Sequence, residues 1–248
     1  TDYFCIPAKT LVPFLRNIRL NTSEAQKASD LLQNWDYVLS PTSIEAGIYV
    51  MWERNIYQEA GRRFIPDALK RLISLQLYRI LEWIENPELK FGENGNANRD
   101  LFLKETFESA VNTLKEKYGN DMVNWKYGQE KYMHVELKPL IYPLLNNAQK
   151  EAYAIKAVPK GGYNNTVNAT SGWEKQTSGA SFRIISDLSD WDKTLMINTP
   201  GQSEDPRSPF YSNLFPIWAD NEYFPAYFTA GKIKENAYSL TILKPVNQ

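Results

Sequence analysis

The stretch that decides the fold runs from residue 181 to 225 and reads SFRIISDLSDWDKTLMINTPGQSEDPRSPFYSNLFPIWADNEYFP. Its first run alternates, with Phe182 and Ile184 on one side and Ile185 on the other, which predicts a strand. A turn rich in Asp and Ser follows. Lys193–Asn198 (KTLMIN) is then a short apolar run between turn signals, which is typical of a buried strand. We therefore expect two strands joined by a turn.

Helical patterns fill most of the first 150 residues. Ser23 with Gln26, and Thr42 with Glu45, each form a capping box that predicts a helix start. Further helices are predicted over residues 9–20, 66–84 and 99–118, and Gly119 ends the last of them. Apolar residues surround most of the circumference of the 66–84 helix, so we expect it to be buried on more than one side.

Strand and turn signals replace the helical patterns after about residue 150. Residues 163–170 (YNNTVNAT) and 238–243 (YSLTIL) are predicted as further short strands. The expected fold class is therefore α+β: a mainly helical first half, 1–150, packed on a few antiparallel strands within 151–248. A sheet of three or four strands has two unpaired edges, which are hazardous in water. We infer that this thin sheet pairs with strands from elsewhere.

Composition excludes several classes of function. The chain has 248 residues and a formal net charge of -1, so nothing indicates a nucleic-acid partner or a membrane surface. No apolar run approaches the roughly 18 residues that a membrane span needs. The single cysteine rules out an intrachain disulfide. With only one histidine in addition, a dedicated zinc site is not expected.

Three groups of residues could carry chemistry, and each also has a simpler explanation. Thr1 could be an N-terminal nucleophile that uses its own amine as base, or simply the residue at which this chain was cut. His134 could be a general base, or a histidine packed in a core. Asp187, Asp190 and Asp192 could bind a hard cation, or lie in a solvated turn. In each case we favour the simpler explanation.

Several separated motifs resemble one family. TVNAT at 166–170, followed by GASFRIISDLSDWDKTLMINTPGQSEDPRSPFYSNLFPIWADNEYFP, resembles the C-terminal part of the β subunit of penicillin acylases. WDYVLSPTSIEAGIYVMWERNI, from residue 35, is similar to the segment that leads into a long helix of that family. The resemblance runs from about residue 8 to the end, with the motifs in the same order. It departs from the family pattern at Lys138, Glu204 and Phe210.

The resemblance implies an N-terminal-nucleophile hydrolase. In such enzymes a precursor cuts itself, and the new N-terminal serine attacks an amide carbonyl to form an acyl-enzyme. The asparagine of the TVN motif is Asn168, which by resemblance donates to the oxyanion; the alternative is a turn residue at the end of a strand. Arg183 occupies the family's Phe-Arg position and either orients the surroundings of the nucleophile or is a structural cation. The serine segment itself is missing from these 248 residues.

The whole chain, 1–248, is therefore expected to be the C-terminal portion of a β subunit in a larger αββα sandwich. Its implied partners are the α subunit and the N-terminal β segment of the same precursor. The implied substrates are acyl amides: β-lactams, N-acyl homoserine lactones or related compounds. The resemblance further implies export to the periplasm or the medium and a possible structural calcium whose ligands are not assigned. The alternative is a non-catalytic binding or scaffold domain derived from the same fold.

Overall fold

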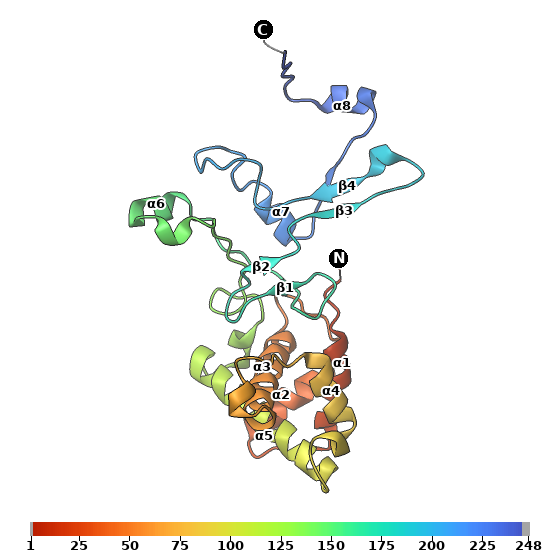
Figure 1. Cartoon of the computed structure of the whole chain (residues 1–248), viewed down its shortest axis with the longest axis vertical. Helices are drawn as coiled ribbons and strands as arrows, with labels where there is room; N and C mark the ends of the chain where they lie inside the picture. The colour runs from red at the N-terminus through yellow and green to blue at the C-terminus, as the bar shows by residue number, and fades with distance from the viewer. Residues whose placement is uncertain (1, 245–248) are drawn as a thin grey trace. The chain divides into compact units, whose positions relative to one another are not determined.

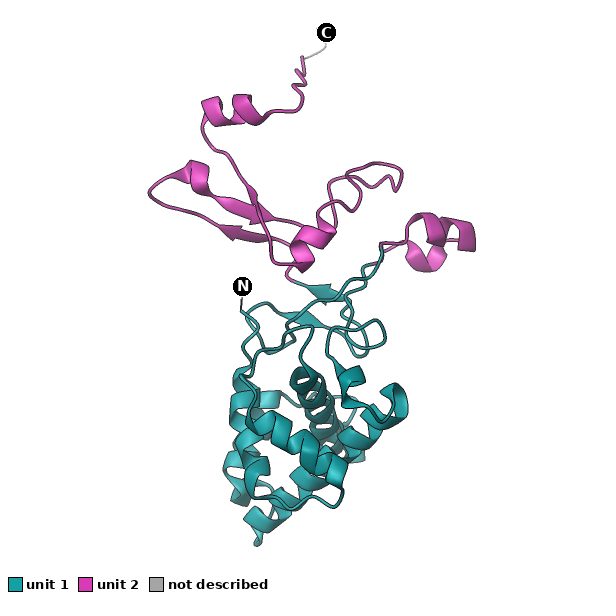
Figure 2. Ribbon diagram, turned by 180° about the vertical axis from the view of Figure 1, so that it is seen from behind, with its two compact units in different colours: residues 1–137, 156–179 teal, residues 138–155, 180–248 magenta. Residues whose placement is uncertain are grey.

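A computed structural model describes residues 2–244 as two compact units (Figure 2). Unit 1 comprises residues 1–137 and 156–179, and unit 2 comprises residues 138–155 and 180–248. The chain passes back and forth between the units, so their division does not coincide with the change from helix to strand expected near residue 150. The question of an N-terminal nucleophile at Thr1 lies outside the described residues.

Unit 1 is built mainly from helices (Figure 1). Its α-helices are α1 (Ile6–Leu11), α2 (Ser23–Gln33), α3 (Ile44–Phe64), α4 (Leu77–Glu85) and α5 (Gly95–Tyr118). Short 3-10 turns lie at η1 (Val12–Asn17), η2 (Asp67–Leu69), η3 (Pro87–Leu89) and η4 (Met122–Trp125). Helices α3 and α5 pack together at the centre, where the Trp52 and Phe107 rings meet edge to face at 5.3 Å. One apolar core therefore holds this unit.

The starts of α2 and α3 were predicted to within one residue. The Thr22 hydroxyl accepts a hydrogen bond from the Ala25 N–H at 3.1 Å, and the Ser43 hydroxyl accepts one from the Ala46 N–H at 2.9 Å. In both helices the cap lies one residue away from the predicted one. The predicted 9–20 helix is instead α1 followed by η1, with the change close to Pro13, which cannot donate to the helical ladder.

The predicted helix over 66–84 is wrong, and so is its expected burial. Only α4 and the short η2 turn form there. Helix α4 buries a single face, through Leu77, Ile80 and Ile84. Leu72 is 81% exposed, because no neighbouring element among the described residues covers the segment before α4. Helix α5 begins earlier than predicted but ends at Gly119, whose φ of 88° permits the turn.

Unit 1 also holds one short antiparallel pair, β1 (Thr170–Ser171) with β2 (Ser178–Gly179). The strand predicted over 163–170 is wrong except at its last residue. The segment forms turns instead, because the side chain of Thr166 bonds the nearby main chain.

Unit 2 contains an antiparallel sheet in the order β3 (Arg183–Ile185), β4 (Leu195–Ile197), β5 (Phe224–Pro225). Its helical turns are η5 (Tyr142–Leu144), α6 (Asn147–Ala152), η6 (Trp191–Lys193), α7 (Phe215–Ala219) and α8 (Ala230–Asn236). Residue 183 pairs with 197, and 196 with 224. The two strands predicted within 181–198 are thereby confirmed, although Leu195 is 38% exposed rather than buried.

The last predicted strand, 238–243, is wrong. These residues are irregular and exposed, and among the described residues no strand pairs with them. A strand without a pairing partner has no ladder to stabilise it. No helix formed by residues 2–244 is long and apolar enough to cross a membrane.

Candidate active site

Asn168 lies in a tight loop of unit 1, residues 162–170, which we call the Asn168 turn. The Thr166 hydroxyl forms hydrogen bonds with main-chain groups inside the turn. It accepts from the Tyr163 N–H at 2.9 Å and lies 3.0 Å from the carbonyl oxygens of both Tyr163 and Asn168. The turn begins at Gly162, whose φ of +87° favours glycine; a Cβ there would also lie 2.3 Å from the Asn168 carbonyl oxygen.

The main chain of Asn168 is fixed by the first residues of the chain. The Asn168 N–H donates to the Asp2 carbonyl at 3.0 Å. The Leu39 N–H donates to the Tyr3 carbonyl at 2.9 Å, and the Gly162 N–H donates to the Leu39 carbonyl at 3.0 Å. Asn168 is itself only 1% exposed. Asn168 is therefore buried within a hydrogen-bonded turn, although Val167 beside it is 78% exposed.

A buried carboxylate of α3 lies beneath the turn. Glu53, 1% exposed, accepts from the Asn165 side-chain amide at 3.2 Å and from the Tyr49 hydroxyl at 2.5 Å. Burial raises the pKa of Glu53 to about 7, although the Tyr49 bond and the Arg54 charge oppose the shift. Burial, with the nearby Glu53 charge, also raises the pKa of Cys5 to about 12, so that thiol stays neutral.

Arg54, the next residue of α3, contacts the same segment. Its guanidinium lies 5.8 Å from the Tyr163 ring and 5.0 Å from the Trp173 ring. Its Nη2 donates to the Gly172 carbonyl at 3.2 Å and lies 2.9 Å from the Met133 sulfur. Cation–π contacts of a desolvated arginine stabilise by about 2 kcal/mol. Arg54 therefore holds residues on both sides of Asn168.

Sequence reasoning missed this polar pair. A signal was present, since Glu53 and Arg54 lie inside the apolar stripe of α3, where buried charges need partners. The partners themselves could not be read from the sequence, because Asn165 lies 112 residues away.

The raised pKa of Glu53 predicts a pH dependence of stability. An acid whose folded-state pKa exceeds its ordinary value binds its proton more tightly when folded, so its contribution is complete below pH 4.5 and is lost as pH rises to about 7. The expected loss is roughly 3 kcal/mol. Urea unfolding of wild type and Glu53→Gln between these pH values should show this slope in the wild type only. Equal slopes would contradict the assignment.

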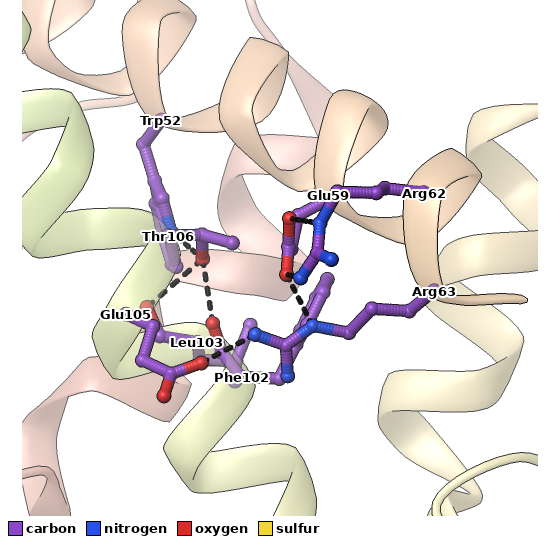
Figure 3. Close-up of polar contacts among 8 residues, drawn as sticks. All are labelled: Trp52, Glu59, Arg62, Arg63, Phe102, Leu103, Glu105 and Thr106. Atoms are coloured by element: carbon purple, nitrogen blue, oxygen red, sulfur yellow. Dashed lines mark hydrogen bonds and ion pairs between the residues drawn. The ribbon is translucent and has the colours of Figure 1, made fainter.

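A groove between α3 and α5 is a further polar feature of unit 1, and Figure 3 shows its hydrogen bonds and ion pairs. Arg63 bonds Glu59, from its own helix, and Glu105, from α5. Deeper in, the Trp52 ring N–H donates to the Thr106 hydroxyl at 3.1 Å. The charges of Glu59, Arg63 and Glu105 are paired with each other, so they tie the two helices together.

Comparison with known proteins gives the family. Residues 1–235 match the model of the penicillin amidase family. The chain belongs to the penicillin amidase family. Among solved structures, the thermostable penicillin G acylase from Alcaligenes faecalis matches the whole chain with a TM-score of 0.56 and 14% identity. At that identity the likeness shows the fold. No curated protein sequence matches the chain.

The family resemblance and the mixed α+β fold predicted from the sequence are thus confirmed. The matched region covers 48% of the penicillin G acylase chain, so this chain spans about half the length of that structure.

Arg183, the second residue selected by family resemblance, lies in unit 2. Its guanidinium donates to the Trp218 carbonyl at 2.5 Å and to the Asn221 side-chain oxygen at 2.6 Å. It also lies 5.4 Å from the Tyr223 ring. The Trp218 carbonyl is near the C-terminal end of α7, where a cation is favourable. These contacts fit the structural role, and the catalytic role is not tested by them.

The aspartates of the β3–β4 turn are occupied by local bonds. The Asp187 carboxylate accepts from the Ser189 N–H and hydroxyl, and the Asp192 carboxylate accepts from the Thr229 N–H and hydroxyl. Within residues 2–244 there is no group of three or more His, Cys, Asp or Glu side chains that could hold a metal ion. The calcium that the family resemblance implies therefore has no ligand assigned among these side chains.

His134 is half-buried. Its carbonyl accepts from the Gln176 N–H at 2.9 Å, and burial lowers the pKa of its imidazole. It lies where the chain returns beside Gln176, so its surroundings match the packed histidine that we favoured. The nearby Glu130 carboxylate opposes that lowering of the His134 pKa.

Proposed function

We propose that this chain is the C-terminal part of an N-terminal-nucleophile amidohydrolase and that the side-chain amide of Asn168 is an oxyanion donor. One observation carries the proposal. In a member of the penicillin amidase family, the asparagine of the TVN motif is 1% exposed, and its main chain makes one hydrogen bond to the Asp2 carbonyl and accepts one from the Thr166 hydroxyl. A donor fixed before the substrate arrives needs no reorganisation during the reaction.

The proposed reaction is acyl transfer to a serine outside this chain. The serine hydroxyl attacks the amide carbonyl while its own α-amine takes the proton. That proton then passes to the leaving amine as the C–N bond breaks, and water hydrolyses the acyl-enzyme. Asn168 contributes by donating its neutral N–H to the oxygen that becomes negative in each tetrahedral state. Substrates are N-acyl compounds with an apolar acyl group, such as β-lactams, N-acyl homoserine lactones or related acyl amides.

The exposure of strand β3 supports the proposed partners. Ile184 and Ile185 are 52% and 53% exposed, yet neighbouring residues of a strand point to opposite faces of a sheet. A strand that is apolar on both faces is typical of the interior of a layered α/β structure. We propose that the α subunit and the N-terminal β segment of the same precursor cover these faces, and that the assembly acts in the periplasm or outside the cell.

Turnover tests the proposal directly. The isolated chain should not hydrolyse a chromogenic N-acyl anilide, because the proposal places the nucleophilic serine outside residues 1–248. The complete precursor, once processed, should hydrolyse it. Clear hydrolysis by the isolated chain would contradict the proposal that the nucleophile lies outside residues 1–248. If the processed complete protein cleaves none of a panel of acyl amides, the non-catalytic scaffold replaces the enzyme.

A further inference from the structure

A cavity of about 190 Å³ opens between α3, α5 and the loop that joins β1 to β2, all within unit 1. Helix α3 contributes Arg54 and Asn55 to its wall, α5 contributes Thr113 and Lys117, and the loop contributes Trp173 and Glu174. A space of this size holds several water molecules or one small organic molecule. The charges and donors of the wall decide which of these fits it.

Arg54 is a buried cation without an acidic partner. It is 3% exposed, and no Asp or Glu side chain among residues 2–244 forms an ion pair with it. Its Nη2 donates to a neutral group, the Gly172 carbonyl. The oxygens of Glu53, the preceding residue, accept hydrogen bonds from two other side chains instead. A buried charge is costly unless it is paired, so an anion in the adjoining cavity would be stabilising.

Two buried donors at the cavity also lack an acceptor. Neither Nε of Arg54 nor Nδ2 of Asn55 has a hydrogen-bond partner within residues 2–244. Both atoms are covered, so an acceptor reaches them when a lining side chain turns aside. Lys117 and Glu174 are suited to that movement, because they form a surface ion pair with side chains 40% and 57% exposed. A carboxylate supplies two acceptor oxygens, and its bonds to a guanidinium are strong.

The remainder of the wall offers apolar surface. The Trp173 side chain is 53% exposed, and its ring lies 5.0 Å from the Arg54 guanidinium. Met51 and the ring of Tyr118 also line the cavity. Such surface beside a few polar groups is typical of sites for small organic ligands. An inorganic anion would use the charge and leave the Trp173 ring without a contact.

We propose that this cavity binds a small organic monocarboxylate. Its carboxylate pairs with Arg54 and accepts from the Asn55 amide, and its apolar body packs against Trp173. The inference goes beyond the proposed function and does not rest on it, since binding here requires neither a serine nor an acyl transfer.

A purely structural Arg54 predicts different results. Its guanidinium lies 5.6 Å from the Tyr132 ring and 5.8 Å from the Tyr163 ring, in addition to its contact with Trp173. If these cation–π contacts are its whole role, water fills the cavity and no carboxylate binds there. Replacing Arg54 then changes stability alone.

Equilibrium dialysis of the complete native protein with radiolabelled benzoate tests the site. We expect saturable binding with a Kd on the order of 1 mM or tighter. Benzamide has the same shape without the charge and should compete at least about 10-fold more weakly. Arg54→Gln should abolish the binding. Arg63→Gln is the matched control, because Arg63 lies on the same helix but is bonded to Glu59 and Glu105, and it should bind benzoate as wild type does.

Thr113→Phe keeps the test decisive if Arg54→Gln does not fold. The new ring fills the cavity from α5 and leaves the buried arginine in place, so benzoate affinity should fall by about 10-fold or more. Ser109→Phe, one turn earlier on α5, lines the neighbouring groove instead and should leave the affinity unchanged. Glu174→Gln removes a negative charge from the rim and should tighten binding by about twofold.

Four results would each overturn the proposal. They are the absence of saturable binding below about 10 mM benzoate, benzamide that competes as well as benzoate, sulfate that competes as well as benzoate, and wild-type affinity in folded Thr113→Phe. The first result would leave water in the cavity, and the third would replace the organic carboxylate with an inorganic anion.

Discussion

Replacing Asn168 with alanine in the complete enzyme should lower kcat by roughly 10²–10³-fold, the cost of one lost oxyanion donor. The side chain is neutral, buried in a turn that Thr166 and Asp2 hold, and belongs to a family motif. KM should change little, because the ground-state carbonyl oxygen carries little charge. Steady-state kinetics on a chromogenic acyl amide measure the effect.

The control for this variant is its effect on folding. The melting temperature should change little relative to wild type, and Asn164→Ala, four residues earlier in the same turn, should keep normal kcat. A kcat within a few-fold of wild type would remove Asn168 from the oxyanion hole. A collapse of the melting temperature would assign it to folding instead.

Replacing Gly47 with alanine should destabilise unit 1 by about 3 kcal/mol or more, the upper range for overpacking a core. A Cβ at Gly47 would lie 1.9 Å from the Trp125 carbonyl oxygen and 3.3 Å from the Tyr132 ring. The carbonyl belongs to main chain, so it cannot move aside as a side chain does. Helix propensity alone predicts the opposite sign, since alanine is the better helix former.

Gly61, in the same helix, provides the matched control. A Cβ there meets nothing within 4 Å. Gly61→Ala should therefore stabilise the protein by about 0.5–1 kcal/mol, as propensity predicts. Urea unfolding of the two variants measures both effects. If Gly47→Ala were as stable as Gly61→Ala, the close approach of α3 to the main chain at Trp125 would be wrong.

Local signals in the sequence were reliable where neighbours in the chain decide the structure. Gly119 ends α5 because its own φ permits the turn, and β3 and β4 form where alternation and turn residues predicted them. The predictions were wrong where contacts between residues far apart in the sequence determine the local structure. The 66–84 segment has helical apolar spacing, but its middle finds no surface among the described residues to pack on, so only α4 forms.

The candidate site, like the fold, was predicted only in part from the sequence. Asn168 was found through its motif, and nothing in its spacing alone would have selected it. Residues 163–170 were predicted as a strand, with Asn168 either an oxyanion donor or a turn residue at the strand end, and the structure has a hydrogen-bonded turn there followed by β1 from Thr170. The bonds from Glu53 to Asn165 and from Asn168 to Asp2 join residues far apart in the sequence, and a single sequence does not record such pairs.

Active-site labelling followed by intact mass analysis tests the central claim most directly. The native protein is treated with a sulfonyl fluoride, which modifies activated serines, and each of its chains is weighed and sequenced from its N-terminus. We predict one adduct, on the N-terminal serine of a processed segment that accompanies this chain, with residues 1–248 unlabelled. A label within residues 1–248, or a native protein without any processed serine segment, would contradict the account.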